Sequence, residues 1–295
     1  MAERGVYISR DTYPFFEEVH VQFDWFPGFA LSQQRKSQIS LHGNFLAAYP
    51  EQKVLEVSSA SLYSLGAALS AMHLKKRTKA GVTSVESAFQ ASRIFGTHGE
   101  IGPFQDYLFL PGKECKKLVK AESQGLHSDR YLYEGMVFHA PAHFISLFYN
   151  FLYLNALCEE ENKDAAEMLL NLEYTAFSDL ATHSLNSQAR SAAIFVSLVR
   201  NGLIEEVQDY DSYLHLFRTT RDGGAIGPES YENVQLLGSR GSVQLLSPVV
   251  PCSFTKLETE CCYREKCSNL TNKKNPVNYL DKVTGHSSDE RSGFA

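Results

Sequence analysis

Residues 84–95, with the sequence SVESAFQASRIF, predict the helix around which the rest of the fold is arranged. Ser84 stands directly before the periodic run, and a hydroxyl residue in that position is a helix start signal. On a helix, Glu86, Gln90 and Arg93 share one polar stripe. The stripe is either one wall of a pocket or a solvated face with a modest intrahelical pair. Spacing alone favours the solvated face, because such stripes are common on surface helices.

Short strands and several helices are predicted on both sides of this segment. Before it, alternating or apolar runs predict strands over residues 19–25 and 53–57, and helices are predicted over residues 32–49 and 61–72. After it, helices are predicted over residues 113–122, 141–157, 164–172 and 188–201. The sequence therefore predicts an α+β fold, a mostly helical single domain with a few short strands.

The pattern weakens in the last part of the chain. Repeated glycines break the periodicity after residue 206, and the residues from 269 onward are polar, which is typical of a disordered tail. We predict a domain over residues 1–206, followed by a poorly patterned and partly disordered extension over residues 207–295. If the extension docks on the domain, Phe217 is one of the apolar residues expected to make the contact.

The composition limits the partners and the location of the protein. A net charge of −6 over 295 residues gives no broad basic surface, so any contact with DNA is expected to be local, at one modified nucleotide. The N-terminus lacks the basic start and apolar run of a signal peptide. The most apolar stretch, residues 144–157, is too short to span a membrane. We therefore expect a cytoplasmic protein that does not associate with membranes.

The six cysteines do not predict a secreted disulfide framework at this chain length. Cys115 and Cys158 stand alone in helix-like segments and are expected to be buried thiols. Four later cysteines are possible zinc ligands, but their spacing fits no ordinary zinc finger: Cys252, Cys261, Cys262 and Cys267. We expect neither a metal nor a cofactor.

Residues 177–190 form a polar loop that leads into a predicted helix, with Asn186 or Ser187 suited to the N-cap. Free N–H groups at a helix start suit a phosphate, to which Arg190 in the first turn can add a bidentate contact. Ordinary capping, with Asp179 in a turn, explains the same pattern. Spacing alone favours ordinary capping.

Trp25 and Phe26 lie beside the turn that begins at Pro27-Gly28. Aromatic side chains in such a place can stack on a flat nucleobase. A core aromatic cluster at the end of a strand is the commoner interpretation of the same residues.

Taken together, these segments resemble the NADAR family, and within it the antitoxins encoded beside DarT-type DNA ADP-ribosyltransferase toxins. The resemblance spans roughly residues 6–204 and rests on the order and spacing of short motifs rather than on any single one. These motifs occupy residues 25–29, 32–33, 36–37, 69–71, 85–90, 148–149, 152–153, 177–179 and 186–190.

The resemblance implies an activity and two partners. The substrates of the family are ADP-ribose derivatives or related N-glycosides, and the antitoxin branch removes ADP-ribose from ADP-ribosylated guanosine in DNA. The expected function is therefore that of an N-glycosidase. Its expected partners are ADP-ribosylated DNA, contacted at the modified nucleotide, and a DarT-type toxin whose modification it reverses.

The resemblance, together with the chemistry of N-glycosidic bond cleavage, gives the expected site residues. Cleavage of an N-glycosidic bond passes through an oxocarbenium-like state, which a carboxylate stabilises while another group activates water or protonates the leaving nitrogen. Glu86 and Asp179 are the predicted catalytic carboxylates, and Lys36 is the candidate if a lysine amine is required. The predicted substrate-binding residues are Trp25, Phe26, Ser70, Gln90, Arg93, Asn186, Gln188 and Arg190.

Two other functions fit the same residues. One is a NADAR hydrolase that acts on a small N-glycoside metabolite instead of DNA. The other is a module that binds ADP-ribosyl groups without cleaving them, because Arg93 stands where the family usually carries a lysine. Release of ADP-ribose from a modified oligonucleotide distinguishes both from the DNA glycosidase.

Overall fold

The fold is described by a computed structural model over residues 1–28, 30–96, 101–139, 145–180 and 187–219. Structural statements below concern these residues. The predicted helix start at Pro141, the predicted site residue Asn186 and the four later cysteines lie outside them.

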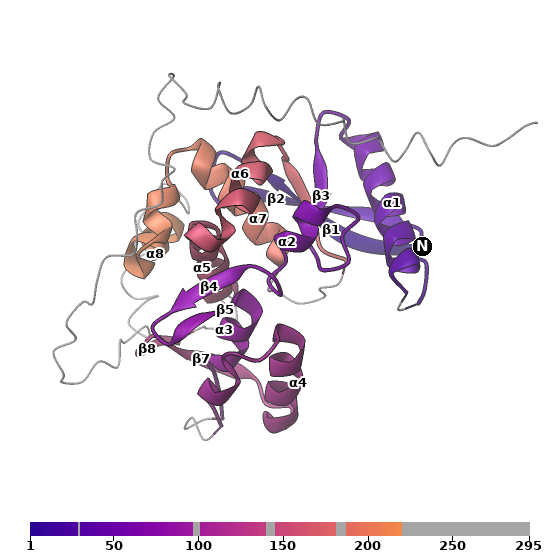
Figure 1. The fold of residues 1–295 in the computed structure, drawn as a ribbon. Helices are drawn as coiled ribbons and strands as arrows, with labels where there is room; N and C mark the ends of the chain where they lie inside the picture. Colours follow the sequence, from indigo (N-terminus) through magenta and orange to yellow (C-terminus); the bar gives the residue numbers. More distant parts are fainter. Residues whose placement is uncertain (29, 97–100, 140–144, 181–186, 220–295) are drawn as a thin grey trace, which may run out of the picture. The chain divides into compact units, whose positions relative to one another are not determined.

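A four-stranded mixed sheet in the order β2-β1-β9-β3 joins three strands from the start of the chain to β9, which comes much later (Figure 1). Strand β1 (Ala2–Ser9) runs antiparallel to β2 (Phe16–Phe23) and to β9 (Ala176–Ser178), whereas β3 (Val54–Glu56) runs parallel to β9. Strands β2, β9 and β3 therefore point the same way, and their carboxyl ends share one edge of the sheet. Strand β2 ends two residues earlier than the strand predicted over residues 19–25.

Helices and two smaller sheets complete the domain, which confirms the predicted α+β class. The remaining strands form a hairpin, β4 (Lys75–Thr78) with β5 (Gly81–Ser84), and a three-stranded sheet of β6 (Arg93–Phe95), β7 (Ser128–Tyr133) and β8 (Met136–His139). The α-helices are α1 (Leu31–Ala48), α2 (Ser64–Ala68), α3 (Val85–Ala91), α4 (Gly112–Glu122), α5 (Ile145–Leu157), α6 (Lys163–Asn171), α7 (Gln188–Arg200) and α8 (Tyr210–Thr219). Three 3-10 turns are η1 (Gln105–Tyr107), η2 (Glu160–Asn162) and η3 (Ile204–Val207). Within the described ranges, no helix is both long and apolar enough to cross a membrane.

Two apolar clusters hold these elements together. The larger one gathers side chains of α3, α5 and α7, among them the fully buried Leu152 and Phe195. The smaller one lies between α1 and the four-stranded sheet and includes Leu41 and Phe45. Helix α5 is apolar on nearly all sides because it is enclosed by other elements, and such a helix needs no polar face.

The predicted helix over residues 84–95 is correct at its start but too long. Ser84 caps it, with its hydroxyl accepting from the Ser87 N–H at 3.1 Å, yet the helix ends at Ala91. The Ala91 carbonyl accepts from Phe104 N–H, and the Ser92 carbonyl accepts from Leu132 N–H. These tertiary bonds replace the next helical turn. Arg93 consequently begins strand β6.

The predicted helix over residues 61–72 is also too long, because only Ser64–Ala68 is helical. Past this short helix, the backbone of residues 69–71 is hydrogen-bonded by side chains from other helices. Gly66 is required for close packing, since a Cβ there would stand 2.0 Å from the Glu56 carbonyl oxygen.

Helix α8 packs on the larger core beyond the boundary predicted at residue 206. Tyr213 is fully buried, and the Phe217 ring lies 4.9 Å from the Tyr213 ring, measured between centroids. Phe217 also makes edge contacts with Phe15 at 6.0 Å. We therefore propose that the domain extends through residue 219.

Two truncations test this boundary. A chain ending at residue 219 is expected to melt like the full chain, whereas one ending at residue 206 should lose several kcal/mol of unfolding free energy. The reason is that each buried aromatic or aliphatic side chain of α8 contributes roughly 1.5–3 kcal/mol. Thermal melts of the three chains provide the measurement. Equal melting temperatures for the two truncations would place the boundary at residue 206.

Candidate functional site

Glu86, Gln90 and Arg93 form a continuous chain of hydrogen bonds. The Gln90 amide donates to Glu86 Oε1 at 3.0 Å, and Arg93 Nη1 donates to Gln90 Oε1 at 3.1 Å. Glu86 is only 6% exposed and Gln90 only 5%. The interpretation that spacing alone favoured, a solvated face, is therefore wrong, because a neighbouring helix covers this stripe.

The covering helix is α4, which lies beside α3 (Figure 1). Gly112, in its first turn, permits the close approach, since a Cβ there would be 3.0 Å from the Glu86 Cβ and 2.8 Å from the Met72 sulfur. The approach brings Lys116 Nζ to 3.5 Å from Glu86 Oε1. Lys116 was not predicted as a site residue, because sequence spacing does not show which helices become neighbours.

The segment of residues 69–71 connects the helices that carry the predicted site residues. The Glu86 N–H donates to the Ala71 carbonyl at 2.9 Å, and the Ala71 N–H donates to Gln188 Oε1 at 2.8 Å. From α5, the Tyr153 hydroxyl donates to the Leu69 carbonyl at 2.6 Å. Gln188, predicted as a substrate-binding residue, thus holds the backbone of this segment.

Ser70, a predicted substrate-binding residue in this segment, is fully buried. Its hydroxyl lies 2.9 Å from Nδ1 of the His73 ring. Ser70 therefore stabilises the fold of residues 69–71, and its hydroxyl is directed to the His73 ring instead of to solvent.

Asp179 follows strand β9 and is held between two residues that bind the same buried carboxylate. Glu56 accepts from the Ser178 hydroxyl at 2.5 Å and from the Leu180 N–H at 3.0 Å. Asp179 itself is 6% exposed. Burial raises the pKa of Glu56, and the two hydrogen bonds partly oppose that rise. Glu56 therefore fixes the backbone on both sides of Asp179. Its signal in the sequence is an acidic residue inside an apolar strand.

The phenol of Tyr149 is buried, and its pKa is affected by three of the predicted site residues. Tyr149 on α5 has its pKa raised well above the usual value, first by burial and then by the negative charges of Glu86 and Asp179. The positive charge of Arg190 lowers the same pKa. Glu86, Asp179 and Arg190, which are distant in sequence, thus all lie within electrostatic range of one side chain. Tyr149 is a further candidate for the site, and spacing analysis did not select it.

Arg190 lies in the first turn of α7, directly after the cap. Ser187 is the N-cap residue, and its hydroxyl accepts from the Arg190 N–H at 3.3 Å. The guanidinium stands 5.8 Å from the centre of the Phe16 ring, and burial lowers its pKa. Tyr7 and Glu18 counteract that effect. Arg190 is therefore a half-buried cation near tyrosines and one carboxylate.

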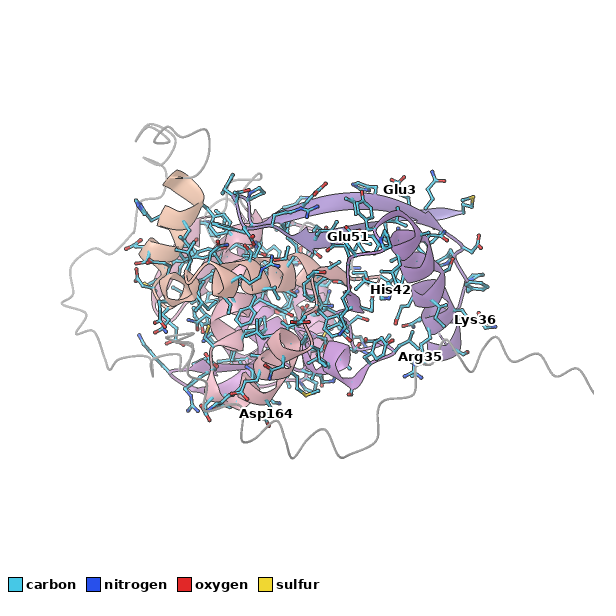
Figure 2. All side chains as sticks on the ribbon, turned by 90° about the horizontal axis from the view of Figure 1, so that it is seen from above. Glu3, Arg35, Lys36, His42, Glu51 and Asp164 are labelled. Carbon is cyan, nitrogen blue, oxygen red and sulfur yellow. The ribbon has the colours of Figure 1, made fainter. Side chains whose placement is uncertain are left out.

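Trp25, Phe26 and Lys36 are on the surface at the carboxyl edge of the sheet. Trp25 is 42% exposed, and Lys36 Nζ lies 5.9 Å from the centre of the Phe26 ring. Figure 2 shows Lys36 projecting outward from α1. Because β2 and β9 run the same way, Trp25 and Asp179 follow the same edge. Trp25 is thus no core residue, contrary to the commoner interpretation.

The two described cysteines are free thiols rather than disulfide partners. Cys115 is fully buried, as predicted, and burial raises the pKa of its thiol to about 12. Cys158 is half-buried. Among the residues that the structure describes, no three His, Cys, Asp or Glu side chains gather in a way that suits a metal ion.

Comparison with protein families identifies the class of protein that has this fold and site. A NADAR family model, described as DarT1-associated NADAR antitoxin, matches residues 2–224 of the 295. The chain therefore belongs to the family of DarT1-associated NADAR antitoxins. The resemblance inferred from the short motifs is confirmed. A search of curated proteins finds no match.

His42 predicts a measurable pH dependence of stability. Its Nε2 lies 2.8 Å from the Ser178 hydroxyl, and burial lowers its pKa from 6.5 to about 4. Between these pH values the unfolded chain binds a proton that the folded chain does not. The free energy of unfolding should therefore fall as the pH falls from 6.5 to 4, by up to about 3 kcal/mol. Glu56 acts in the opposite direction, since its raised pKa gives stability at low pH that is lost as the pH rises.

Thermal melts at several pH values isolate the contribution of His42 to the pH dependence of stability. His42→Gln keeps a donor toward Ser178 and should flatten the dependence below pH 6.5. His127→Gln, at an exposed loop position, is the control and should leave it unchanged. Parallel pH profiles for wild type and His42→Gln would contradict this assignment.

Proposed function

We propose that this antitoxin is an N-glycosidase that removes ADP-ribose from ADP-ribosylated guanosine in DNA. The observation that carries the proposal is a pair of buried carboxylates, Glu86 and Asp179, on elements that pack together through α5 and α7 and within electrostatic range of the Tyr149 phenol. Family membership supports the choice of ADP-ribose as the group removed. The reaction needs negative charge at the ribose and a proton for the departing nitrogen.

In the proposed reaction the bond between ribose C1 and the guanine nitrogen breaks, and water supplies the hydroxyl that C1 receives. Glu86 stabilises the positive charge that develops on the sugar. Its hydrogen bond from Gln90 and its ion pair with Lys116 hold the carboxylate in place. Rigid placement matters, because preorganised charges stabilise a transition state without reorganisation cost. Asp179 activates water, delivers the proton or anchors the ribose hydroxyls.

Five of the other predicted residues are assigned to binding. Trp25 is an exposed ring and Phe26 a half-buried one, and a base or the adenine can stack on either. Lys36 beside them and Arg190 at the start of α7 are the proposed contacts of the two phosphates, together with Arg93. Lys36 is exposed at the carboxyl edge, whereas Lys116 is the lysine that lies against Glu86. If an amine takes part in the chemistry, Lys116 is better placed.

Substrate comparison tests the proposal. The protein is incubated with an ADP-ribosylated single-stranded oligonucleotide and, separately, with small N-glycoside metabolites, and the products are separated by chromatography. We expect free ADP-ribose and unmodified guanosine from the oligonucleotide, with much slower release from the metabolites. Faster turnover of the metabolites would instead indicate a metabolite hydrolase. Tight binding of the oligonucleotide without any release would indicate a binding module.

A further inference from the structure

Helix α4 carries a lysine stripe, defined here as Lys113, Lys116, Lys117 and Lys120. Their spacing, i, i+3, i+4 and i+7, places the four side chains along one side of the helix. All four residues are exposed. The stripe stands out in a chain whose net charge is −6.

Most of this charge is not neutralised by the protein. Lys116 pairs with Glu86, whereas Lys113, Lys117 and Lys120 make no ion pair within the part of the chain that the structure describes. The acidic residues of the same helix are Glu114 and Glu122. At about 100° per residue, they lie on other sides of the helix than the stripe. Glu122 is moreover engaged by the Tyr107 hydroxyl.

Packing holds the stripe outward in a fixed direction. The adjoining side of α4 is anchored by Cys115 and Val119, both fully buried, and by Gly112 against Glu86. The helix therefore cannot turn its lysines inward without losing its core contacts. From Lys113 to Lys120 the stripe extends about 10 Å along the axis, enough to face several successive phosphates.

We propose that the lysine stripe binds the phosphodiester backbone of the strand that carries the modified base. This inference rests on the proposed function and names the surface by which DNA is recognised. Charge complementarity selects a polyanion, because lysines that neutralise phosphates release condensed counterions and gain salt-dependent affinity. The stripe adjoins the candidate site, because Nζ of Lys116 lies 3.5 Å from Oε1 of Glu86. A strand bound along the stripe is therefore expected to run toward Glu86. The contact is local, in keeping with the acidic remainder of the chain.

The test removes three charges and leaves Lys116 in place. The variant Lys113→Gln, Lys117→Gln, Lys120→Gln keeps residues with similar helix propensity. A control with the same change of charge on other elements is Lys53→Gln, Lys79→Gln, Lys163→Gln. Values of kcat/KM are measured from low to moderate salt on a single-stranded oligonucleotide with one modified guanosine. The same measurement is made on the isolated ADP-ribosylated guanosine nucleoside, which has no flanking phosphates.

We expect the stripe variant to lose about 10–100-fold in kcat/KM on the oligonucleotide at low salt, and nothing on the nucleoside. The slope of log kcat/KM against log salt should become shallower by about 2, from roughly 0.7 per lost contact on single strands. The control should match wild type in both. An unchanged slope and unchanged oligonucleotide turnover in the stripe variant would overturn the proposal.

A binding measurement separates failure of the stripe from failure of the proposed function. Fluorescence anisotropy with an unmodified single strand at low salt needs no turnover. If the wild type cleaves no substrate but the stripe variant loses strand affinity, the result supports the stripe as a DNA-binding surface and contradicts the proposed reaction. If strand affinity is unchanged and the variant instead loses affinity for the purified toxin, the stripe is a protein interface and the proposal is wrong.

Discussion

Glu86→Gln is expected to lower the turnover of ADP-ribosylated DNA by about 10²–10⁴-fold, the range typical for loss of one acid–base or charge-stabilising group. The substitution removes the negative charge but keeps an oxygen that can accept from Gln90. Little stability should be lost, because the partner Lys116 is 59% exposed at its side chain and exposed pairs contribute at most about 1 kcal/mol. Single-turnover release of ADP-ribose, beside a thermal melt, is the measurement.

Glu114→Gln is the matched control for this substitution. It removes the same charge from an exposed position on α4, two residues before Lys116. We expect it to retain wild-type turnover. Near-wild-type release by Glu86→Gln would remove Glu86 from the catalytic machinery and leave it as a structural partner of Gln90 and Lys116.

Asp179→Asn is expected to slow turnover by about 10²-fold or more, with a rise in KM if the carboxylate also anchors ribose hydroxyls. Glu56 holds the flanking Ser178 and Leu180 in place, so the loop should keep its conformation when only the charge at position 179 is lost. The amide has almost the same shape as the carboxylate. Steady-state kcat and KM on the modified oligonucleotide provide the measurement.

Asp164→Asn supplies the control, since Asp164 is exposed on α6 and is shown in Figure 2. We expect it to keep wild-type kcat and KM. A wild-type rate for Asp179→Asn would place Asp179 away from the site.

The elements with strong local signals were predicted well from the sequence. Ser84 starts α3 and Ser187 starts α7, because a hydroxyl cap acts on neighbouring N–H groups and needs no tertiary partner. The class of fold follows from the mixture of such helices with short strands. Strand β1 gave no comparable signal, since its N-terminal half is polar and its place beside β9 depends on residues far along the chain.

The surroundings of the candidate site were less predictable, since they depend on long-range packing. Whether the Glu86 stripe is solvated or buried is decided by α4, and α4 can approach only because residue 112 is a glycine. Tyr149 joins the site because α5 passes between α3 and α7. Such contacts follow from the tertiary fold, so Lys116 and Tyr149 could not be selected by spacing within one helix.

The most direct test of the proposed activity is the fate of one modified strand. An oligonucleotide with a single ADP-ribosylated guanosine is mixed with excess wild-type protein, and its intact mass is followed with time. The proposed activity predicts that the strand returns to its unmodified mass while one equivalent of free ADP-ribose appears. A strand that stays modified in the presence of folded, strand-binding protein would contradict it.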